Sequence, residues 1–520
     1  MGMLKSISLE NYKCFRKLKV EDKEELEIAP LTVLCGINSS GKSSILKSLL
    51  MLKQSYESEN TTQTLSLNGK WVDNGFFNDV VYHNEKITKE NEHKYNRFLI
   101  NNKFIIKSYN TKIKTQDASS FRELRKIFYR NSDIAKFEIC ITLIAERSTS
   151  ESTNEFSRYI DDNQISYYSI SLQAYDKNGN EIVGTDCNIV LENIVNSDRE
   201  YNLTWLNIPC SKSPSNTMKD PYTCTCYFSG LRVSNIYRDN MADEIRYVLP
   251  NLLSIFKIAA LQYDGIQFIA PLRQMPERNY FIKGNVDSVG ISGEDTPYLL
   301  AKLKGEPITT DMSGSWRNKL PERFSVVRST YDEIISQWAD HFGLGNLEIN
   351  GNGANVSIGM SGHNIADIGF GVSQILPIIT QGIIMQKNQI LLIEQPEIHL
   401  HPKMQMDMAD FLIQLAKTDR NVIVETHSDH IINRLVKRIM ETRGNVNDIS
   451  NYIKIYFINN DNEAREVTAD RIKVSKYRGI INAKENFFTQ FASETESILN
   501  ISYKNLEKDN FQYLEMEEDL

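Results

Sequence analysis

Three signals follow one another in Leu31-Thr-Val-Leu-Cys-Gly-Ile-Asn-Ser-Ser-Gly-Lys-Ser-Ser-Ile-Leu46. An apolar, β-branched run predicts a strand, and it leads directly into a glycine loop, Gly36 to Ser43, that matches G-x-x-x-x-G-K-[ST]. The residues after the loop, 44–51, predict a helix. Strand, loop and helix together are the context in which this pattern binds phosphate, whereas a chance glycine turn is the structural alternative. The sequence therefore predicts a nucleotide site at its N-terminal end.

The residues of the loop have separate expected roles. Gly36 and Gly41 allow backbone N–H groups to face the β-phosphate, and the helix N-terminus adds partial positive charge. Lys42 is expected to reach the β- and γ-phosphates, and the Ser43 hydroxyl to ligate Mg²⁺. ATP and Mg²⁺ are thus the expected cofactors, and the expected binding residues in this loop are Gly36, Asn38, Ser39, Ser40, Gly41, Lys42, Ser43 and Ser44.

Composition limits the class of protein and its partners. A chain of 520 residues with 24% charged and 41% hydrophobic residues is typical of a globular protein with more than one structural unit. The net charge of −8 argues against general attraction to nucleic acid, so any DNA contact needs a local basic patch. One candidate patch is 121–130, although a solvated helix face is the favoured interpretation. Seven scattered cysteines, no membrane-length apolar run and no signal segment favour a cytoplasmic location without membrane contact.

The second half of the chain contains further strands with polar ends. The run Gln389-Ile-Leu-Leu-Ile-Glu394 is continuously apolar before its carboxylate, as in a central parallel strand. Residues 421–427 form a similar run that ends at His427, and 452–458 form a third. These strands and the helix after the glycine loop indicate an α/β fold class. Because the phosphate loop and this carboxylate lie far apart in sequence, the nucleotide core is expected to be split. The expected domains are a core of 1–54 and 265–470, a β-rich and helical insertion at 55–264, and a helical C-terminal extension with an acidic tail at 471–520.

These motifs occur in an order that resembles a known group of ATPases. The glycine loop, Gly369-Phe-Gly-Val-Ser-Gln374, Glu394-Gln-Pro-Glu-Ile-His-Leu-His-Pro402 and Glu425-Thr-His-Ser-Asp429 are similar to motifs of ATP-binding-cassette (ABC) type ATPases of the structural-maintenance-of-chromosomes (SMC) and RecF kind. The block 394–402 resembles most a prokaryotic AAA-family branch common in anti-phage systems. That branch includes the Septu ATPase and is similar to the ATPase half of the overcoming-lysogenisation-defect nucleases. Residues 268–280 and 482–490 also resemble blocks of that branch.

The resemblance implies an ABC-type head with an antiparallel β lobe and a composite site. Two heads would face each other head to tail, with each nucleotide between one loop and the partner's Gly371 and Ser373 at a helix start. Glu394 would hold the metal together with Ser43, and His427 would lie near the γ-phosphate. Lys13 and Arg16 match positions that contact nucleotide in relatives, and Gln54 is a weaker candidate for a metal-side glutamine. His399 and His401 could also suggest zinc, but a loop contact is favoured.

Hydrolysis is the open point of this assignment. Gln395 stands where ABC proteins usually carry the glutamate that activates water, and an amide can orient water without accepting its proton. Either Glu397 supplies the base, or it contacts a partner subunit and hydrolysis is slow. The expected catalytic set is Glu394, Gln395, Glu397 and His427.

The resemblance favours an ATP-binding, ATP-hydrolysing subunit of a defence complex that forms dimers or larger assemblies and regulates a separate nuclease, such as an HNH protein. Too few residues follow Ile458 for the metal-dependent nuclease domain that the lysogenisation-defect proteins carry. Two alternatives stay open: an ATP-gated DNA clamp for repair or chromosome maintenance, and a self-contained nuclease with carboxylates in the insertion, such as Asp161 and Asp162.

Overall fold

The computed structural model describes the chain in several ranges. These ranges are 2–59, 65–82, 97–107, 116–128, 134–147, 163–194, 197, 199–209, 217–239, 241, 243–281, 284, 286–314, 316, 320–352, 355–461 and 466–482. Among the helices in these ranges, none has both the length and the apolar character that a membrane span requires.

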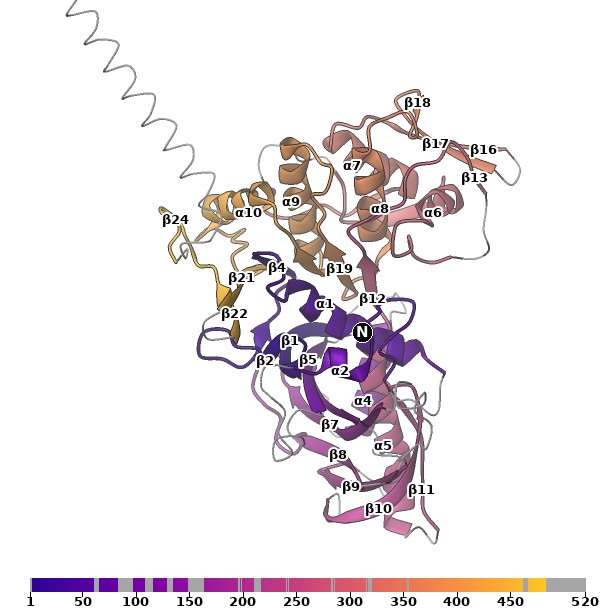
Figure 1. Cartoon of the computed structure of the whole chain (residues 1–520), viewed down its shortest axis with the longest axis vertical. Coiled ribbons are helices and arrows are strands. Elements are labelled where there is room, and N and C mark those ends of the chain that lie inside the picture. Colours follow the sequence, from indigo (N-terminus) through magenta and orange to yellow (C-terminus); the bar gives the residue numbers. More distant parts are fainter. Residues whose placement is uncertain are drawn as a thin grey trace, which may run out of the picture.

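A six-stranded sheet carries the glycine loop and lies in the middle of the molecule (Figure 1). Its strand order is β12-β19-β20-β4-β21-β22; neighbouring strands are parallel except for the last pair. Both faces of the parallel strands are buried, which explains their continuous apolar runs. The strands are β4 (Leu31–Gly36), β12 (Ile266–Ile269), β19 (Ile390–Glu394), β20 (Asn421–Glu425), β21 (Ile453–Asp461) and β22 (Glu466–Arg471).

Successive side chains of this sheet point into two different cores. Ile390 and Ile423 pack in the core that also holds α1 (Lys42–Glu57), whereas Leu391 and Val422 face the core formed with α8, α9 and α10. Because side chains alternate along a strand, the terminal residues Glu394 and Glu425 fall on the α1 side. The bounds of the helices on the other side are α8 (Gly371–Ile384), α9 (Pro402–Lys417) and α10 (Asp429–Thr442).

A ten-stranded antiparallel sheet forms one end of the molecule, in the lower part of Figure 1. Its order is β11-β10-β9-β8-β7-β6-β5-β1-β2, and β3 pairs with the middle of β1 at Ser6 and Ile7. Strand β1 pairs with β5, so the first strands of the chain and the predicted insertion share one sheet. The strands are β1 (Met3–Tyr12), β2 (Phe15–Lys17), β3 (Leu26–Glu27), β5 (Arg97–Lys107), β6 (Lys136–Arg147), β7 (Asn163–Tyr175), β8 (Cys187–Asn193), β9 (Glu200–Leu206), β10 (Met218–Ser229) and β11 (Arg232–Tyr237).

Within the described residues, three helices accompany this lobe: α2 (Phe77–Val80), α4 (Gln116–Ile127) and α5 (Asp243–Leu261). Helix α4 buries Phe121 and Leu124 against the sheet and exposes Arg122 and Arg125. This arrangement agrees with the interpretation of 121–130 as a solvated helix face, while Arg130 lies outside the described residues.

The opposite end is helical, with small sheets at its edge (Figure 1). Helices α6 and α7 lie there with the strands β13 to β18, and the short pair β23–β24 packs near α10. The bounds are α6 (Thr296–Leu303), α7 (Tyr331–His341), β13 (Tyr280–Phe281), β14 (Pro307–Thr310), β15 (Val327–Thr330), β16 (Leu347–Asn352), β17 (Asn355–Met360), β18 (His363–Asn364), β23 (Val474–Ser475) and β24 (Gly479–Ile480).

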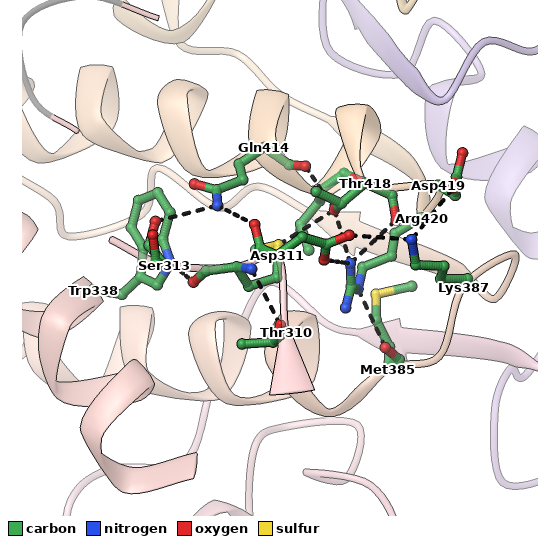
Figure 2. A network of polar contacts seen from close by, with 12 residues as sticks. Thr310, Asp311, Ser313, Trp338, Met385, Lys387, Gln414, Thr418, Asp419 and Arg420 are labelled. Carbon is green, nitrogen blue, oxygen red and sulfur yellow. Dashed lines mark hydrogen bonds and ion pairs between the residues drawn. The ribbon is translucent and has the colours of Figure 1, made fainter. Parts of the chain in front are cut away.

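A polar network ties this helical end to the central sheet (Figure 2). Asp311, just after β14, accepts hydrogen bonds from Arg420 Nη1 at 3.0 Å on one carboxylate oxygen and pairs with Lys387 Nζ at 3.1 Å on the other. Its backbone carbonyl accepts from Gln414 Nε2 at 2.7 Å. One aspartate therefore joins the β14 loop to α9 and to the start of β20.

The mixed α/β fold with a phosphate loop is confirmed. Of the predicted helical extension at 471–520, only residues up to 482 are described, and these form the end of β22 and the strands β23 and β24 instead of a helix. The acidic tail, most of 482–490, and Asp161 and Asp162 lie outside the described residues. The described cysteines are free thiols.

Candidate functional site: the phosphate loop and the strand ends

A pocket of about 500 Å³ opens over the glycine loop. This volume is within the range that small-molecule and cofactor pockets usually have. The loop supplies most of its wall, and the ends of β19 and β20 and the turn after β1 supply the rest. The lining residues are Lys13, Cys14, Asn38, Ser39, Ser40, Gly41, Lys42, Ser43, Ser44, Gln395, Glu425 and His427.

The loop follows a path that its glycines make possible. Gly36 has φ of 141°, and a Cβ there would lie 2.1 Å from the carbonyl oxygen of Ile458. Gly41 has φ of 99°, and its Cβ would lie 2.6 Å from Cys14 Sγ. Side chains are therefore excluded at both ends of the loop, and the backbone passes close to β21 and to the β1–β2 turn.

Two lysines bring positive charge to the pocket. Lys42 is 3% exposed, and its ammonium donates to the carbonyl oxygens of Gly36 at 3.2 Å and Ile37 at 2.6 Å. Burial lowers the pKa of Lys42. Burial, and then the neighbouring charge of Lys47, lowers the pKa of Lys13 to about 8. A bound anion would stabilise the charged form of both lysines, because an opposite charge offsets the cost of burying the ammonium.

The strand ends place three carboxylates behind the loop. Ser43 Oγ donates to Glu425 Oε1 at 2.9 Å, and Glu394 is the in-register neighbour of Glu425 on the next parallel strand. Burial, and then the charge of Glu425, raises the pKa of Glu394 to about 7. Burial also raises the pKa of Glu425 and of Glu397. The donor set of one hydroxyl and nearby carboxylate oxygens is the kind that Mg²⁺ prefers.

Glu397 contacts the loop that carries His427. Its two oxygens accept a hydrogen bond from the His427 backbone N–H at 2.6 Å and one from Thr426 Oγ1 at 2.8 Å. Burial, and then the charge of Lys42, lowers the pKa of His427, which favours the neutral imidazole at pH 7. The carboxylate of Glu397 therefore holds the end of β20 in place.

Gln395 is fixed by its backbone. Its φ of 44° lies in the left-handed region, its N–H donates to the Glu425 carbonyl at 2.8 Å, and its own carbonyl accepts from Arg273 Nη1 at 3.2 Å. Gln395 also lines the pocket. A left-handed residue that is not glycine is uncommon, and here hydrogen bonds on both sides of the residue stabilise it.

Arg273 was missed in the sequence and connects two of the motifs. It is 5% exposed and donates to the Glu394 carbonyl at 2.9 Å and to Gln374 Oε1 of α8 at 3.3 Å. Burial lowers its pKa to about 10, so the guanidinium stays charged at neutral pH. Its position inside the block 268–280 was the one available signal, because an arginine beside a buried strand needs acceptors.

The start of α8 lies outside the pocket over the loop. Ser373 lines a different hollow, and its hydroxyl donates to the Phe370 carbonyl at 2.7 Å. Gly371 is near the 394–402 block, where a Cβ would lie 3.6 Å from the His399 carbonyl oxygen. Within one chain, the structure thus does not bring Gly371 and Ser373 to the residues that surround the loop.

Several weaker predictions have a clear structural outcome. Gln54 lies in the last turn of α1, where its side chain donates to the Ser66 carbonyl at 2.5 Å and accepts from the Val72 N–H at 3.1 Å. It therefore organises the loop after α1, and its role on the metal side stays a prediction that these contacts do not support. Arg16 is exposed and does not line the pocket.

The two histidines considered for zinc have other contacts. The His399 ring packs edge-on against Phe370 with centroids 4.8 Å apart, and His401 Nδ1 accepts the Lys403 N–H at the start of α9. In the described residues the one cluster with metal-like spacing is His341, Asp407 and Asp410, and it includes neither His399 nor His401. The loop-contact interpretation of 399–401 is the one that the geometry favours.

Comparison with known proteins identifies the family. None of the curated proteins matches the chain. Solved structures with similarity include an SMC head domain from Thermotoga maritima (8% identity, 91% of this chain and 100% of that chain, TM-score 0.31). An Smc head bound to the C-winged-helix domain of ScpA (11%, 91% and 98%, 0.37) and an Smc head bound to the C-terminal domain of ScpA derived from Pyrococcus furiosus (10%, 91% and 97%, 0.34) are also similar.

The family model described as an AAA ATPase domain matches residues 3–262 and 283–432. These ranges include the glycine loop, the antiparallel lobe and the ends of β19 and β20. The chain belongs to the AAA ATPase domain family.

Proposed function

We propose that this chain is the ATP-binding and ATP-hydrolysing subunit of a bacterial anti-phage defence complex, in which ATP-held dimers or larger assemblies regulate a separate nuclease. The observation that carries the ATPase part is the pocket in which the glycine loop meets Gln395, Glu425 and His427. Nucleotide phosphates fit a wall of backbone N–H groups and lysines, and bound Mg²⁺ would neutralise charge on the β- and γ-phosphates. The defence role rests on the resemblance of the block 394–402.

Assembly of two heads accounts for the separation of the motifs. Gly371 and Ser373 lie at the N-terminus of α8, which is suited to bind an anion, yet they stand apart from the pocket of their own chain. In a head-to-tail dimer they would reach the γ-phosphate held by the partner's loop. Arg273 would then connect the γ-phosphate contact of α8 with the end of β19, because it joins Gln374 of α8 to the carbonyls of Glu394 and Gln395.

Turnover in this arrangement would be slow. Gln395 lines the pocket and can orient a water molecule, but its amide cannot take the proton. Both oxygens of Glu397 already accept hydrogen bonds from the end of β20, which favours a positioning role over a role as general base. The protein would therefore remain assembled for long periods after it binds ATP.

The assembly is tested by measuring mass with and without ATP and Mg²⁺, using light scattering on Gly371→Glu. A side chain fits at this position, because its Cβ would meet other atoms only at 3.6 Å or more. The acidic side chain should repel the partner's nucleotide, so the variant should bind ATP and stay monomeric. Gly351→Glu on β16, where a Cβ would also have only ordinary contacts, is the matched control and should assemble.

ATP-dependent assembly that survives in Gly371→Glu would contradict the composite site. The partner is tested separately: a protein encoded beside this chain, with HNH-type chemistry, should copurify with the assembled form. The nuclease activity of that protein should no longer be regulated when Lys42→Ala abolishes ATP binding. If no adjacent nuclease gene exists, or if the nuclease behaves identically with Lys42→Ala, the defence part of the proposal fails while the ATPase part stands.

A further inference from the structure

Two carboxylates end neighbouring parallel strands behind the phosphate loop. Glu394 of β19 and Glu425 of β20 are partners in register, and the alternation of each strand turns both toward α1. Like charges directly opposite each other on neighbouring strands repel. The pair therefore needs a positive partner when both groups are ionised.

One carboxylate oxygen of Glu425 has no hydrogen-bond partner. The residue is 5% exposed, its Oε1 accepts from Ser43 Oγ at 2.9 Å, and its Oε2 is buried without a hydrogen-bond partner. An ionised carboxylate oxygen that is buried and unpaired is costly. This oxygen belongs to a residue that lines the pocket over the loop.

The side chains that could neutralise or replace Glu425 have other partners. The ammonium of Lys42 donates to the carbonyl oxygens of Gly36 and Ile37 within the loop. Gln54, the residue whose side chain was expected on the metal side, is held by Ser66 and Val72 at the far end of α1. Glu425 is thus the side chain that stands in direct contact with the expected metal ligand Ser43.

We propose that Glu425 is a ligand, directly or through a water molecule, of the divalent cation that accompanies the nucleotide, together with Ser43 and beside Glu394. The inference rests on the proposed nucleotide site and deepens it. A divalent cation would neutralise the two neighbouring carboxylates and provide a partner for the unpaired Oε2. The Ser43 hydroxyl, which donates to Glu425, would then present its lone pair to the cation.

Manganese binding tests this role without relying on turnover. Mn²⁺ is titrated into the full-length protein with saturating ADP, and the free ion is followed by electron paramagnetic resonance. Glu425→Gln keeps the shape and the acceptor for Ser43 but removes the charge. Its Mn²⁺ affinity should fall by at least about tenfold, and its affinity for a fluorescent ADP in EDTA should stay within about twofold of wild type.

Matched variants identify the cause of any loss. The exposed Glu322→Gln carries the same change in charge away from the pocket and should bind Mn²⁺ like wild type. Glu425→Asp keeps the charge on a shorter side chain and should fall between wild type and Glu425→Gln. If Glu425→Gln does not fold, as judged by circular dichroism, the aspartate variant carries the test with the same expected direction.

Two results would overturn the inference. Mn²⁺ affinity that is unchanged in the folded Glu425→Gln or Glu425→Asp, while Ser43→Ala weakens it, would show that Glu425 is not a ligand and would leave the proposed function intact. Failure of the wild type to bind either ADP or Mn²⁺ would remove the proposed function and this inference together.

Discussion

Two buried acidic groups on opposite sides of the central sheet have very different surroundings. Asp410 of α9 is fully buried and accepts four hydrogen bonds, two from Arg434 and two from Arg438 of α10. Glu425 at the end of β20 is almost as buried, yet one of its oxygens has no hydrogen-bond partner and its neighbour Glu394 carries the same charge. Two arginines already neutralise Asp410, whereas we propose that a divalent cation neutralises Glu425.

The largest expected effect concerns Asp410, whose carboxylate is fully hydrogen-bonded. Asp410→Asn removes the negative charge that two guanidinium groups share in the interior, where Arg438 is 1% exposed. Breaking a buried pair on one side is strongly destabilising, so the free energy of unfolding should fall by about 3–5 kcal/mol. Urea unfolding followed by circular dichroism measures this.

Glu425→Gln is the matched change at the other site and should cost little or increase stability in the absence of nucleotide and divalent cation, because it relieves repulsion with Glu394. Equal destabilisation of Asp410→Asn and Glu425→Gln would contradict the distinction between the two sites.

The next effect concerns Arg273, which joins α8 to the carbonyls of Glu394 and Gln395. Arg273→Met preserves much of the buried volume but leaves these acceptors without their donor. We expect phosphate release to fall by about 100-fold, because Gln395, which we propose to orient water, is no longer fixed, with little change in ATP affinity. Steady-state phosphate release and a nucleotide titration together measure the two quantities.

Arg278→Met, in the same segment but exposed and paired with Asp367, is the control and should keep both near wild type. A drop in ATP affinity as large as the drop in rate would instead mean that Arg273 shapes the pocket itself.

A smaller effect is expected in the network of Figure 2. Asp311→Asn weakens the ion pairs with Arg420 and Lys387 but retains the carbonyl contact from Gln414. The partners are partly buried and have other hydrogen bonds, so the loss of stability should be about 1–2 kcal/mol. Thermal unfolding in the absence of nucleotide detects it, and unchanged ATP affinity would confirm that this network supports the fold alone.

The smallest effect is a pH dependence at Lys13, whose pKa is lowered to about 8 by burial and by Lys47. Below pH 8 the ammonium is charged and attracts phosphate, and above pH 8 it becomes neutral. ATP affinity should therefore fall as the pH rises from 7 to 9.5, by roughly fivefold or about 1 kcal/mol. Lys13→Arg stays charged throughout and should show a weaker dependence, whereas identical profiles would exclude a role for Lys13 in binding.

The parts of the fold that follow from contiguous residues were predictable. The glycine loop, its flanking strand and helix, and the buried strands before Glu394 and His427 each carry their chemistry in a short run. The pairing of β1 with β5 across the predicted boundary at residue 54 was not, because sheet partners are chosen by tertiary contacts. The same reason explains the strands β23 and β24 where a helical extension was expected.

The residues of the site that escaped prediction depend on long-range contacts. The acceptors of Arg273 lie on α8 and at the end of β19, more than 100 positions away in sequence. Glu425 was visible as part of a strand end, yet only the contact with Ser43 distinguishes it from His427, two residues later. The alternating direction of side chains along β19 and β20 was the available signal, since it places Glu425 and Glu394 on one face.

Steady-state phosphate release with ATP and Mg²⁺, measured on wild type and Lys42→Ala together with nucleotide binding, is the decisive test of the proposed ATPase. We expect ATP binding and slow turnover in the wild type, both lost in Lys42→Ala, since the buried ammonium is the main positive charge of the loop. Wild-type protein that neither binds nor hydrolyses ATP, or a Lys42→Ala variant that retains both, would contradict it.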